Sequence, residues 1–501
     1  MSVTRTPGLP VVDNGVLVST NPVTGEEVGR FAVAAADDVA AAVTRARDAA
    51  RWWADLGYAG RRRRLLRYRA VLANRVGELA ALMRRETGKP RTEATVEATA
   101  AIDHIAWAAL HARRVLGFRR VRRSLLMAEH AAYLEYQPFG VVGVIGPWNY
   151  PVLTPMGSIG YALAAGNAVV FKPSEYTPAV SQWLVDRFAE VVGEQPVLQI
   201  AHGGGDVGAE LCRSSVDKLA FTGSTATGRK VMAACAPTLT PVLLECGGKD
   251  AMIVDADADL DAAVSACVWG GMTNAGQTCV GIERVYVADA VYDEFVVRLV
   301  DRARRLTVGV GDDADYGPIT MPGQLDVIRR HIDDAIASGG RAILGGPDAV
   351  RPPYVMPTIL VDVPDDSMAV REETFGPTLT VTRVRDADEA VARANSSRYG
   401  LGGSVFSRSR GVELARRLRS GMTSVNSTLS FAGMPNLPFG GVGDSGFGRI
   451  HGADGLREFT RPKAISRRRA RSPLPSMSFE RTPKAAARIA AVVKLVHGRA
   501  R

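Results

Sequence analysis

The sequence has few of the features that indicate a disulfide scaffold, a metal centre or a membrane span. Five cysteines occur in 501 residues and none forms a Cys-x-x-Cys pair, which argues against a disulfide framework and against a zinc site. The seven histidines are scattered, without a His-Glu-x-x-His motif, so no metal is expected. No apolar run approaches the roughly 20 residues that cross a bilayer, and the first residues lack the apolar segment of a signal peptide. These absences favour a cytoplasmic protein.

Positive charge is distributed unevenly along the chain. The net charge is +10, but residues 467–501 hold ten Lys or Arg and one Glu, so nearly all of the excess lies in this tail. Arginine-rich stretches at 61–64 and 113–123 fall on or beside alanine- and leucine-rich helical segments, where solvated faces or subunit contacts are expected. We therefore expect a near-neutral body, a basic tail and no nucleic-acid partner.

The order of the predicted elements indicates an α/β fold of two or three domains. Residues 8–33 favour short strands, and three segments with helical apolar spacing follow: 37–53, 61–87 and 92–115. From Gly140 to Glu245, short apolar strands alternate with helices, and a second series of this kind runs from Asp259 to about Thr428. Repeated β-α-β order predicts parallel, doubly wound sheets.

One thiol stands at a glycine-bearing bend. Cys279 follows a Gly-Gln-Thr turn and precedes the strand-favouring run Val285–Val287. A cysteine in such a bend can be held out toward a ligand, but its reactive form is the thiolate, so it needs a base, a cation or local dipoles that lower its pKa. Considered alone, Cys279 would more often be an inert buried thiol than a nucleophile.

Two further polar residues lie where predicted strands end. Glu245 ends the strand that begins at Val242 and precedes a Gly-Gly-Lys bend, where partial burial would raise its pKa and suit it as a general base. Asn149 follows another strand, and its amide could donate to an oxyanion. The alternatives are a solvated loop carboxylate and a turn-forming asparagine between prolines.

Candidate ligand-binding segments also follow strands. The turn Gly223–Gly228 opens a helix, where backbone N–H groups can approach a phosphate. Lys172 and Glu175 could hydrogen-bond ribose hydroxyls, or could simply be surface charges. The segment Gly441–Gly446 matches G-x-G-x-x-G, but no strand precedes it and no β-α-β unit surrounds it, so we interpret it as a loop that packs near a site.

Taken together, these motifs resemble one enzyme superfamily. They comprise Cys279, Glu245, Asn149, Lys172, the turn Gly223–Gly228, the segment Glu373-Thr374-Phe375-Gly376-Pro377 and the loop Pro438–Gly448. In this order, over roughly residues 18–465, the chain resembles the NAD(P)-dependent aldehyde dehydrogenase superfamily. The resemblance implies two doubly wound α/β domains and a small β oligomerisation element. The boundaries it implies are 1–119 and 139–246 for the NAD-binding domain, 247–448 for the catalytic domain, 120–138 and 449–466 for the oligomerisation element, and 467–501 for the tail.

The resemblance also implies a mechanism. The Cys279 thiolate would attack the aldehyde carbon, while Asn149 and the Cys279 backbone N–H hold the oxyanion of the thiohemiacetal. Hydride transfer to the nicotinamide would leave a thioester. Glu245 would then activate the water that hydrolyses it to the acid.

The cofactor site follows from the same resemblance. Glu373 would bind the nicotinamide ribose beside Phe375, Lys172 and Glu175 the adenosine ribose, and Ser224 the pyrophosphate. The other cofactor residues that it implies are Ile145, Pro147, Trp148, Ser174, Gly205, Phe221, Gly223 and Gly247. A Glu175 carboxylate that accepts from a free 2′-hydroxyl would repel a 2′-phosphate, so NAD is preferred and NADP remains possible.

Substrate and assembly are constrained less closely. The segment Asn274–Cys279 is similar to semialdehyde and general aldehyde dehydrogenases, whereas Leu437–Gly446 with His451-Gly452 is more like the fatty- and aromatic-aldehyde branch. We favour an apolar aldehyde. Succinate semialdehyde, a CoA-acylating relative and a non-catalytic structural relative are the alternatives. By resemblance, a homodimer or homotetramer is expected.

The tail predicts a short basic helix. Thr482-Pro483 suits an N-cap and first helical position, and Ile489, Val492, Val493 and Val496 fall on one stripe. Such a helix at 482–501 could contact an anionic membrane surface peripherally. A helix docked on the enzyme body and a frayed end are the alternatives.

Overall fold

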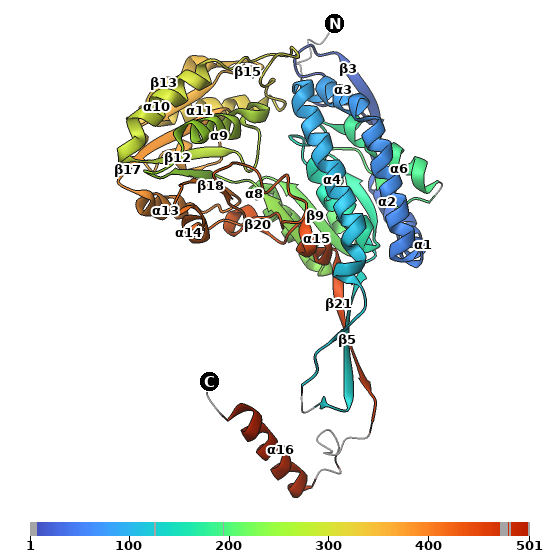
Figure 1. Ribbon diagram of the computed structural model, residues 1–501. Coiled ribbons are helices and arrows are strands. Elements are labelled where there is room, and N and C mark those ends of the chain that lie inside the picture. Colours follow the sequence, from blue (N-terminus) through green and yellow to red (C-terminus); the bar gives the residue numbers. More distant parts are fainter. Residues whose placement is uncertain (1–7, 125–126, 194, 471–478, 480–481, 499–501) are drawn as a thin grey trace.

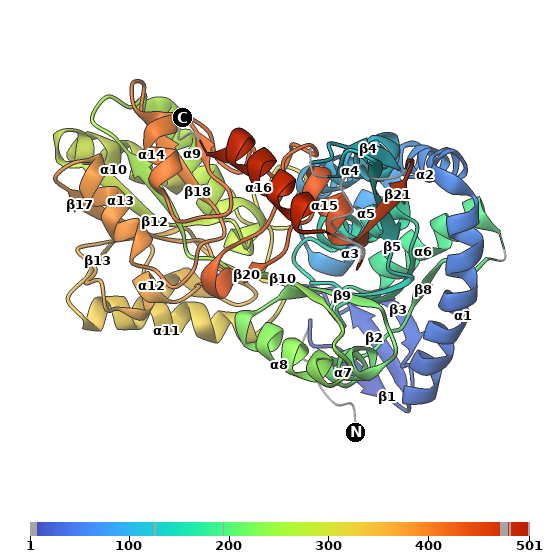
Figure 2. The same cartoon turned by 90° about the horizontal axis from the view of Figure 1, so that it is seen from below.

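The computed structural model describes residues 8–124, 127–193, 195–470, 479 and 482–498. Figures 1 and 2 show two lobes joined side by side, and an arm that projects from one of them. One lobe holds a six-stranded sheet in the order β20-β10-β9-β6-β7-β8, and the other a seven-stranded sheet in the order β13-β16-β17-β12-β11-β18-β19. The α/β class with two doubly wound sheets and a small β element, predicted from the sequence, is confirmed.

The six-stranded sheet is parallel except at one edge. Its parallel strands are β6 (Val141–Ile145), β7 (Ala168–Lys172), β8 (Leu198–Ile200), β9 (Lys218–Gly223) and β10 (Val242–Cys246). β20 (Gly446–Phe447) pairs antiparallel with β10. Every residue of β6 and β7 is buried, which explains their uninterrupted apolar sequences, since helices cover both faces of a parallel sheet.

The helices of this lobe are α1 (Ala36–Asp55), α2 (Gly57–Asn74), α3 (Val76–Thr87), α4 (Arg91–Leu116), α5 (Leu153–Ala165), α6 (Pro178–Val192), α7 (Gly205–Arg213) and α8 (Thr225–Cys235). Three antiparallel strands precede them: β1 (Val11–Asp13), β2 (Val16–Thr20) and β3 (Glu27–Ala32). The single helix expected over 61–87 was wrong. Arg75 leaves the helical conformation at φ −116°, ψ 22°, directly after Asn74, a residue of low helix propensity, so that α2 and α3 are separate.

The seven-stranded sheet forms the core of the second lobe. Its strands are β11 (Asp250–Val254), β12 (Ile282–Ala288), β13 (Arg341–Leu344), β16 (Thr358–Val361), β17 (Thr378–Val384), β18 (Gly403–Phe406) and β19 (Ser424–Val425), with the two-stranded β14 (Val350–Arg351) and β15 (Tyr354–Val355) beside them. Its helices are α9 (Leu260–Met272), α10 (Asp289–Arg304), α11 (Gly323–Ala337), α12 (Met368–Arg371), α13 (Ala387–Asn395) and α14 (Gly411–Arg417). A short α15 (Gly452–Glu458) returns the chain to the first lobe, where Leu456 is buried in its core.

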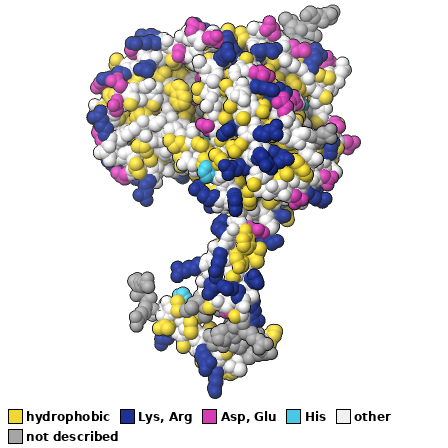
Figure 3. All heavy atoms as spheres, turned by 45° about the vertical axis from the view of Figure 1, so that its right-hand side comes forward, with side chains coloured by type: hydrophobic (Ala, Val, Ile, Leu, Met, Phe, Trp, Pro, Cys, Tyr) yellow, Lys and Arg dark blue, Asp and Glu magenta, His cyan; other side chains and the backbone are white. Residues whose placement is uncertain are grey.

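The arm is a three-stranded antiparallel sheet. It consists of β4 (Arg119–Val121), β5 (His130–Pro138) and β21 (Thr460–Arg468). β5 begins at His130, after residues 125 and 126, which lie outside the described residues. Figure 3 shows Lys and Arg side chains gathered along this arm.

The basic tail ends in a helix, as its sequence predicts. α16 (Pro483–His497) has Thr482 as its N-cap, with the Thr482 hydroxyl accepting from the Ala485 N–H at 3.2 Å. Figure 1 shows α16 beyond the far end of the arm, apart from the enzyme body, so a helix docked on that body is not what the structure contains. None of the helices in the described ranges combines the length and apolar character that a bilayer span requires.

Candidate active site

The thiol of Cys279 follows a tight left-handed turn. After α9, Asn274, Ala275 and Gly276 take φ values of +51°, +56° and +70°. Left-handed conformations cost a non-glycine residue roughly 1–3 kcal/mol. A Cβ on Gly276 would lie 2.1 Å from the Gly376 carbonyl, so only glycine fits there. The Gly-Gln-Thr segment noted in the sequence is therefore the end of a strained turn, which its surroundings must stabilise.

Gln277 stabilises the turn through its side chain. Its Nε2 donates to the Asn274 carbonyl at 2.8 Å and to the Pro318 carbonyl at 3.2 Å, while its Oε1 accepts from the Thr320 N–H at 2.8 Å. Glu93 of α4 accepts from the Asn274 N–H at 2.7 Å. The amide of a buried glutamine is thus fully used in fixing the backbone that carries Cys279.

Asn149 lies beside the same turn, although it belongs to the loop after β6. Its Nδ2 donates to the Gln277 carbonyl at 2.9 Å, and its own carbonyl accepts from Asn274 Nδ2 at 3.0 Å. An asparagine amide has two hydrogens, and the bond to Gln277 uses one of them. The structure therefore brings Asn149 and the Cys279 turn together across 128 residues of chain.

A buried ion pair holds the loop that carries Asn149. Lys89 Nζ lies 2.7 Å from Glu97 Oε2 and donates to the Asn149 carbonyl at 2.8 Å. Glu97 Oε1 accepts from the N–H groups of Val152 and Leu153 at 2.8 and 3.2 Å. Because Lys89 and Glu97 are both buried, removing either partner would leave an uncompensated charge, so the pair holds the loop more firmly than an exposed ion pair would.

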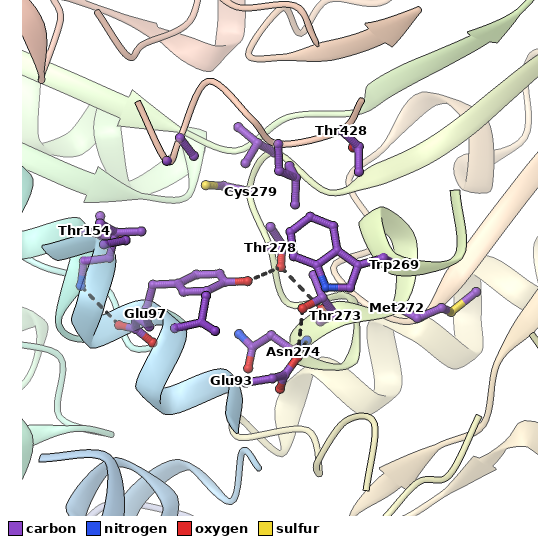
Figure 4. Close-up of a pocket in the computed structure, with 18 of the residues that line it drawn as sticks. Glu93, Glu97, Thr154, Trp269, Met272, Thr273, Asn274, Thr278, Cys279 and Thr428 are labelled. Atoms are coloured by element: carbon purple, nitrogen blue, oxygen red, sulfur yellow. Dashed lines mark hydrogen bonds between the residues drawn. The ribbon is translucent and has the colours of Figure 1, made fainter. Parts of the chain in front are cut away.

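Cys279 faces a large cavity between the lobes, of about 830 Å³. Figure 4 shows its sulfur between Thr154 on one side and Trp269 on the other. Burial raises the pKa of the thiol, and the nearby carboxylates Glu373, Asp250 and Glu245 raise it further. The surroundings of Cys279 therefore do not lower the pKa of the thiol on balance, and its deprotonation needs a base.

Glu245 lies near the end of β10, lines the same cavity and is 2% exposed. Among the described residues, neither of its carboxylate oxygens has a hydrogen-bond partner. Burial raises its pKa well above the ordinary value, and the nearby Arg449 offsets part of that effect. A Cβ on Gly440 would lie 2.7 Å from Oε1, so the carboxylate rests against the loop 438–448. This loop packs near the site as expected, since Ser445 Oγ donates to the Gly247 carbonyl at 2.8 Å.

The cavity is lined mainly by apolar side chains. These include Val96, Leu153, Val268, Trp269, Met272, Val280, Leu306, Leu401, Leu429, Phe439 and Ile450. Its basic side chains of the Lys and Arg type are Lys89, which is paired with Glu97, and Arg302. A mostly apolar cavity of this size suits a large apolar ligand.

The sequence-predicted cofactor residues gather where the parallel strands of the first lobe end, which is where doubly wound sheets bind ligands. β6 and its following loop carry Ile145, Pro147 and Trp148; β7 and its loop carry Lys172, Ser174 and Glu175; Phe221, Gly223 and Ser224 follow along β9; Gly247 follows β10; and Gly205 begins α7. Glu373 and Phe375 reach this edge from the second lobe, where the Trp148 and Phe375 rings lie 5.7 Å apart.

The groups at this edge fit a dinucleotide. The buried Lys172 ammonium has three donors, and in the described structure it bonds only Glu175, at 3.3 Å. A Cβ on Gly205 would meet nothing within 4 Å, which leaves open space over the first N–H groups of α7. Ser224 is the N-cap of α8, where its hydroxyl accepts from the Thr227 N–H at 3.2 Å. Two helix N-termini and a partly unsatisfied ammonium thus lie at this edge of the sheet, and such groups suit phosphates and ribose hydroxyls.

Glu373 is held against Gly247 and Gly248 by a second clamp. Its Oε1 accepts from the Gly248 N–H at 3.0 Å, and burial raises its pKa to about 8. Glu283 accepts from the N–H groups of Thr374 and Phe375, at 2.8 and 3.0 Å, and is paired with the Lys249 ammonium. This clamp fixes Phe375 at φ +52°.

Several supporting residues were not identified from the sequence: Lys89, Glu93, Glu97, Lys249, Gln277 and Glu283. The signal available for Glu93 and Glu97 was a pair of acidic residues, four apart, in a helix rich in alanine and threonine. Such spacing indicates one helix face, but it does not reveal that this face is turned inward.

Comparisons with known proteins agree with this geometry. The aldehyde dehydrogenase family matches residues 12–465. The 4,4'-diapolycopene aldehyde oxidase of Methylomonas sp is 39% identical over 91% of this chain and 87% of its own. A protein of Mycobacterium ulcerans (strain Agy99), named provisionally as a succinate-semialdehyde dehydrogenase that uses NADP(+), is 37% identical over 88% and 87%. The crystal structure of NAD-dependent aldehyde dehydrogenase from Sinorhizobium meliloti superposes with a TM-score of 0.88, at 32% identity over 94% of each chain.

The chain belongs to the aldehyde dehydrogenase family. It is an NAD(P)-dependent enzyme that oxidises an aldehyde to the carboxylic acid.

Proposed function

We propose that this enzyme oxidises large apolar aldehydes, with Cys279 as the nucleophile. The observation that carries the proposal is the cavity of about 830 Å³, which is lined mainly by apolar side chains and contains both Cys279 and Glu245. A long hydrocarbon chain would be desolvated along this lining while its aldehyde group meets the thiol.

The residues around Cys279 have distinct roles in this proposal. The thiol gives its proton to solvent water as its sulfur attacks the aldehyde carbon, and the second hydrogen of the Asn149 amide, with the Cys279 backbone N–H, stabilises the oxyanion. Glu245 turns from Gly440 toward the cavity and takes a proton from the water that hydrolyses the thioester. Its raised pKa makes it a stronger base than an ordinary glutamate.

The dinucleotide supplies the hydride acceptor when it is bound. Lys172 and Glu175 would hold the adenosine ribose, the N-termini of α7 and α8 the pyrophosphate, and Glu373 the nicotinamide ribose. We propose a preference for NAD, since the Glu175 carboxylate is one-third exposed at this edge and would repel a 2′-phosphate.

Succinate semialdehyde is the less favoured substrate. Its carboxylate would need a cation close to Cys279, and Lys89 is already paired with Glu97 and bonded to the Asn149 carbonyl. The name of the Methylomonas relative, 4,4'-diapolycopene aldehyde oxidase, is that of an enzyme for a large aldehyde and supports the apolar alternative.

The test is the rate of NADH formation with an aldehyde series of increasing chain length. We expect kcat/KM to rise from butanal to dodecanal and to remain low for succinate semialdehyde, with no requirement for CoA. Cys279→Ala should abolish the reaction. A maximum at succinate semialdehyde, or a dependence on CoA, would contradict the proposal.

The lobes and the arm have separate roles in the proposed assembly. Residues 1–119 and 139–246 would form the NAD-binding domain, 247–448 the catalytic domain, and 120–138 with 449–466 the oligomerisation element. The arm projects from the body with backbone groups of β4 and β21 at its edges, and such edges favour pairing with a second copy in a dimer or tetramer.

α16 would contact an anionic membrane surface. Leu495 is 80% exposed, and the helix carries Lys484, Arg488 and Lys494 but no acidic residue. An amphipathic basic helix on a basic arm suits a surface of anionic lipid. Anionic vesicles should retain the full chain but not a 1–466 truncation, and neutral vesicles neither. Equal retention of the two proteins would rule out this role for α16.

A further inference from the structure

One face of α9 leads along the cavity away from the nucleophile. Ser265, Val268, Trp269 and Met272 recur at helical spacing and all line the cavity. At 1.5 Å per residue, Ser265 lies about 10 Å along the helix from Met272. Since the turn that carries Cys279 begins directly after Met272, Ser265 marks the distal end of this wall.

Arg302 of α10 stands at that distal end. Its Nη2 donates to Ser265 Oγ at 3.2 Å, its side chain is exposed, and it lines the cavity. In the described part of the chain, no carboxylate lies within 4 Å of its guanidinium, whereas Arg298 on the same helix is paired with Asp261 and Glu294. Arg302 is therefore a cation whose donors are mostly unused, at the edge of an apolar cavity.

The neighbouring side chains leave this end open to solvent. Trp269 is 51% exposed, and Val96 of α4, which also lines the cavity, is 65% exposed. Asp315 also lines this part of the cavity, but its Oδ2 accepts from the Thr307 N–H at 2.7 Å. A ligand can therefore extend from Cys279 to the mouth and meet a guanidinium there.

We propose that Arg302, with Ser265, forms a distal subsite for a carboxylate at the far end of a long apolar aldehyde. The substrate class is that of long ω-oxo acids, whose aldehyde reaches Cys279 while the carboxylate remains at the mouth. A guanidinium presents several N–H donors in a planar fork that matches a carboxylate. This subsite rests on the proposed role of Cys279 as the nucleophile, and it concerns the end of the substrate that is far from the aldehyde.

The subsite has a consequence for dialdehydes. Oxidation of one end yields a carboxylate and leaves an aldehyde at the other end, which is an ω-oxo acid. Arg302 would then favour re-entry of this half-oxidised product, so that both ends are oxidised in successive turnovers, each with its own oxidised cofactor. A reaction that oxidises both ends of an apolar chain to aldehydes would supply such a substrate.

The experiment compares dodecanal with the ω-oxo acid of the same chain length. In the full-length enzyme, Arg302→Met should raise KM for the ω-oxo acid about tenfold, the effect of losing one partly exposed charged contact. KM for dodecanal should change less than about twofold, because its apolar end makes no such contact. Raising the salt concentration should weaken wild-type binding of the ω-oxo acid alone.

Two further variants serve as controls. Arg304→Met removes an exposed arginine on the same helix that does not line the cavity, and it should leave both KM values unchanged. Arg302→Lys keeps the charge and should restore part of the affinity. An equal rise in both KM values, or no change for the ω-oxo acid, overturns the subsite. A wild-type enzyme inactive on both aldehydes would instead overturn the proposed function on which the subsite rests.

Discussion

Cys279 and Glu245, which both line the cavity, are held in opposite ways. The turn that carries Cys279 is strained and tightly bonded: Gln277 uses its whole amide on it, and Glu93 and Asn149 bond to it from two other segments. Glu245 is almost fully buried, yet its carboxylate has no hydrogen-bond partner among the described residues. The segment that carries the thiol is fixed by hydrogen bonds, whereas none holds the Glu245 carboxylate in the described structure.

This difference matches the order of steps in the proposed mechanism, with Cys279 as the nucleophile and Glu245 as the base. The nucleophile must stand at one position before the aldehyde arrives, because misplacement by about 1 Å can cost 10²-fold in rate. The base acts later, on water, and a carboxylate that had strong partners would hold its proton less readily and move less easily. An unpartnered buried carboxylate is costly, so its persistence beside Gly440 fits a group with a functional task.

The largest test of this comparison is Glu245→Gln. The variant keeps the shape of the side chain but removes the base, so thioester hydrolysis should slow by about 10²–10⁴-fold. Formation of the thioester should continue, because the turn that holds Cys279 is untouched. Stopped-flow NADH absorbance should show a burst near one equivalent per active site followed by a slow steady state. Loss of the burst itself would mean that Glu245 is also needed to deprotonate the thiol.

The next test disrupts the buried ion pair that holds the loop of Asn149 beside the Cys279 turn. Glu97→Gln leaves the Lys89 ammonium buried without its carboxylate, which should destabilise the fold by about 3–5 kcal/mol. Since Lys89 and Glu97 also hold the loop of Asn149, kcat should fall by about 10²-fold. Urea denaturation and steady-state rates measure both effects.

Glu294→Gln is the matched control, because it breaks an ion pair of Arg298 in which both side chains are substantially exposed. Such pairs contribute about 1 kcal/mol or less, and activity should be unchanged. If the two variants behaved alike, the Asn149 loop would not depend on the buried pair.

The same contrast explains what the sequence could predict. The sheets could be predicted from the apolar runs of β6 and β7 and from the alternation of strands with helices. Glycines at strand ends marked the bends beside Cys279, Asn149 and Glu245, because each is a local pattern. Their convergence was expected only through resemblance. The break at Arg75 was missed, since apolar periodicity continues across it.

The supporting contacts were not predictable because they join distant segments. Lys89 reaches Asn149 across 60 residues, and Gln277 reaches Pro318 across 41. The raised pKa of the Cys279 thiol also depends on burial by both lobes and on carboxylates from three different segments. Local sequence indicates which residue types are present, but not how completely folding removes them from water.

The smallest expected effect is the contribution of the Glu373 carboxylate to the pH dependence of the free energy of unfolding. Burial raises its pKa from the ordinary 4.5 to about 8, so the native state keeps a proton that the unfolded chain releases between these values. Stability from this group is full below the unfolded pKa and is lost as the pH rises through the folded one. The pKa values of His202 and His331 are instead lowered, to about 4. These two groups therefore reduce the stability of the native state only as the pH falls below their ordinary pKa of 6.5. Between pH 6.5 and 8 the carboxylates therefore dominate.

In that window Glu373→Gln should flatten the decline in the unfolding midpoint temperature, by the equivalent of about 1 kcal/mol per pH unit. Glutamine keeps a carbonyl oxygen for the Gly248 N–H, so the clamp against Gly247 is preserved. Glu372→Gln, at the exposed neighbouring position, should leave the wild-type slope unchanged.

Glu245 contributes with the same sign, because its pKa is also raised by burial. The double variant of Glu245→Gln and Glu373→Gln should therefore show a still smaller change of midpoint temperature with pH. Parallel slopes for wild type and Glu373→Gln would mean that Glu373 is already ionised in the native state. Glu373, which accepts a hydrogen bond from the Gly248 N–H, would then differ from Glu245 in charge as well as in hydrogen bonding. Of these two carboxylates, only Glu245 would have a raised pKa.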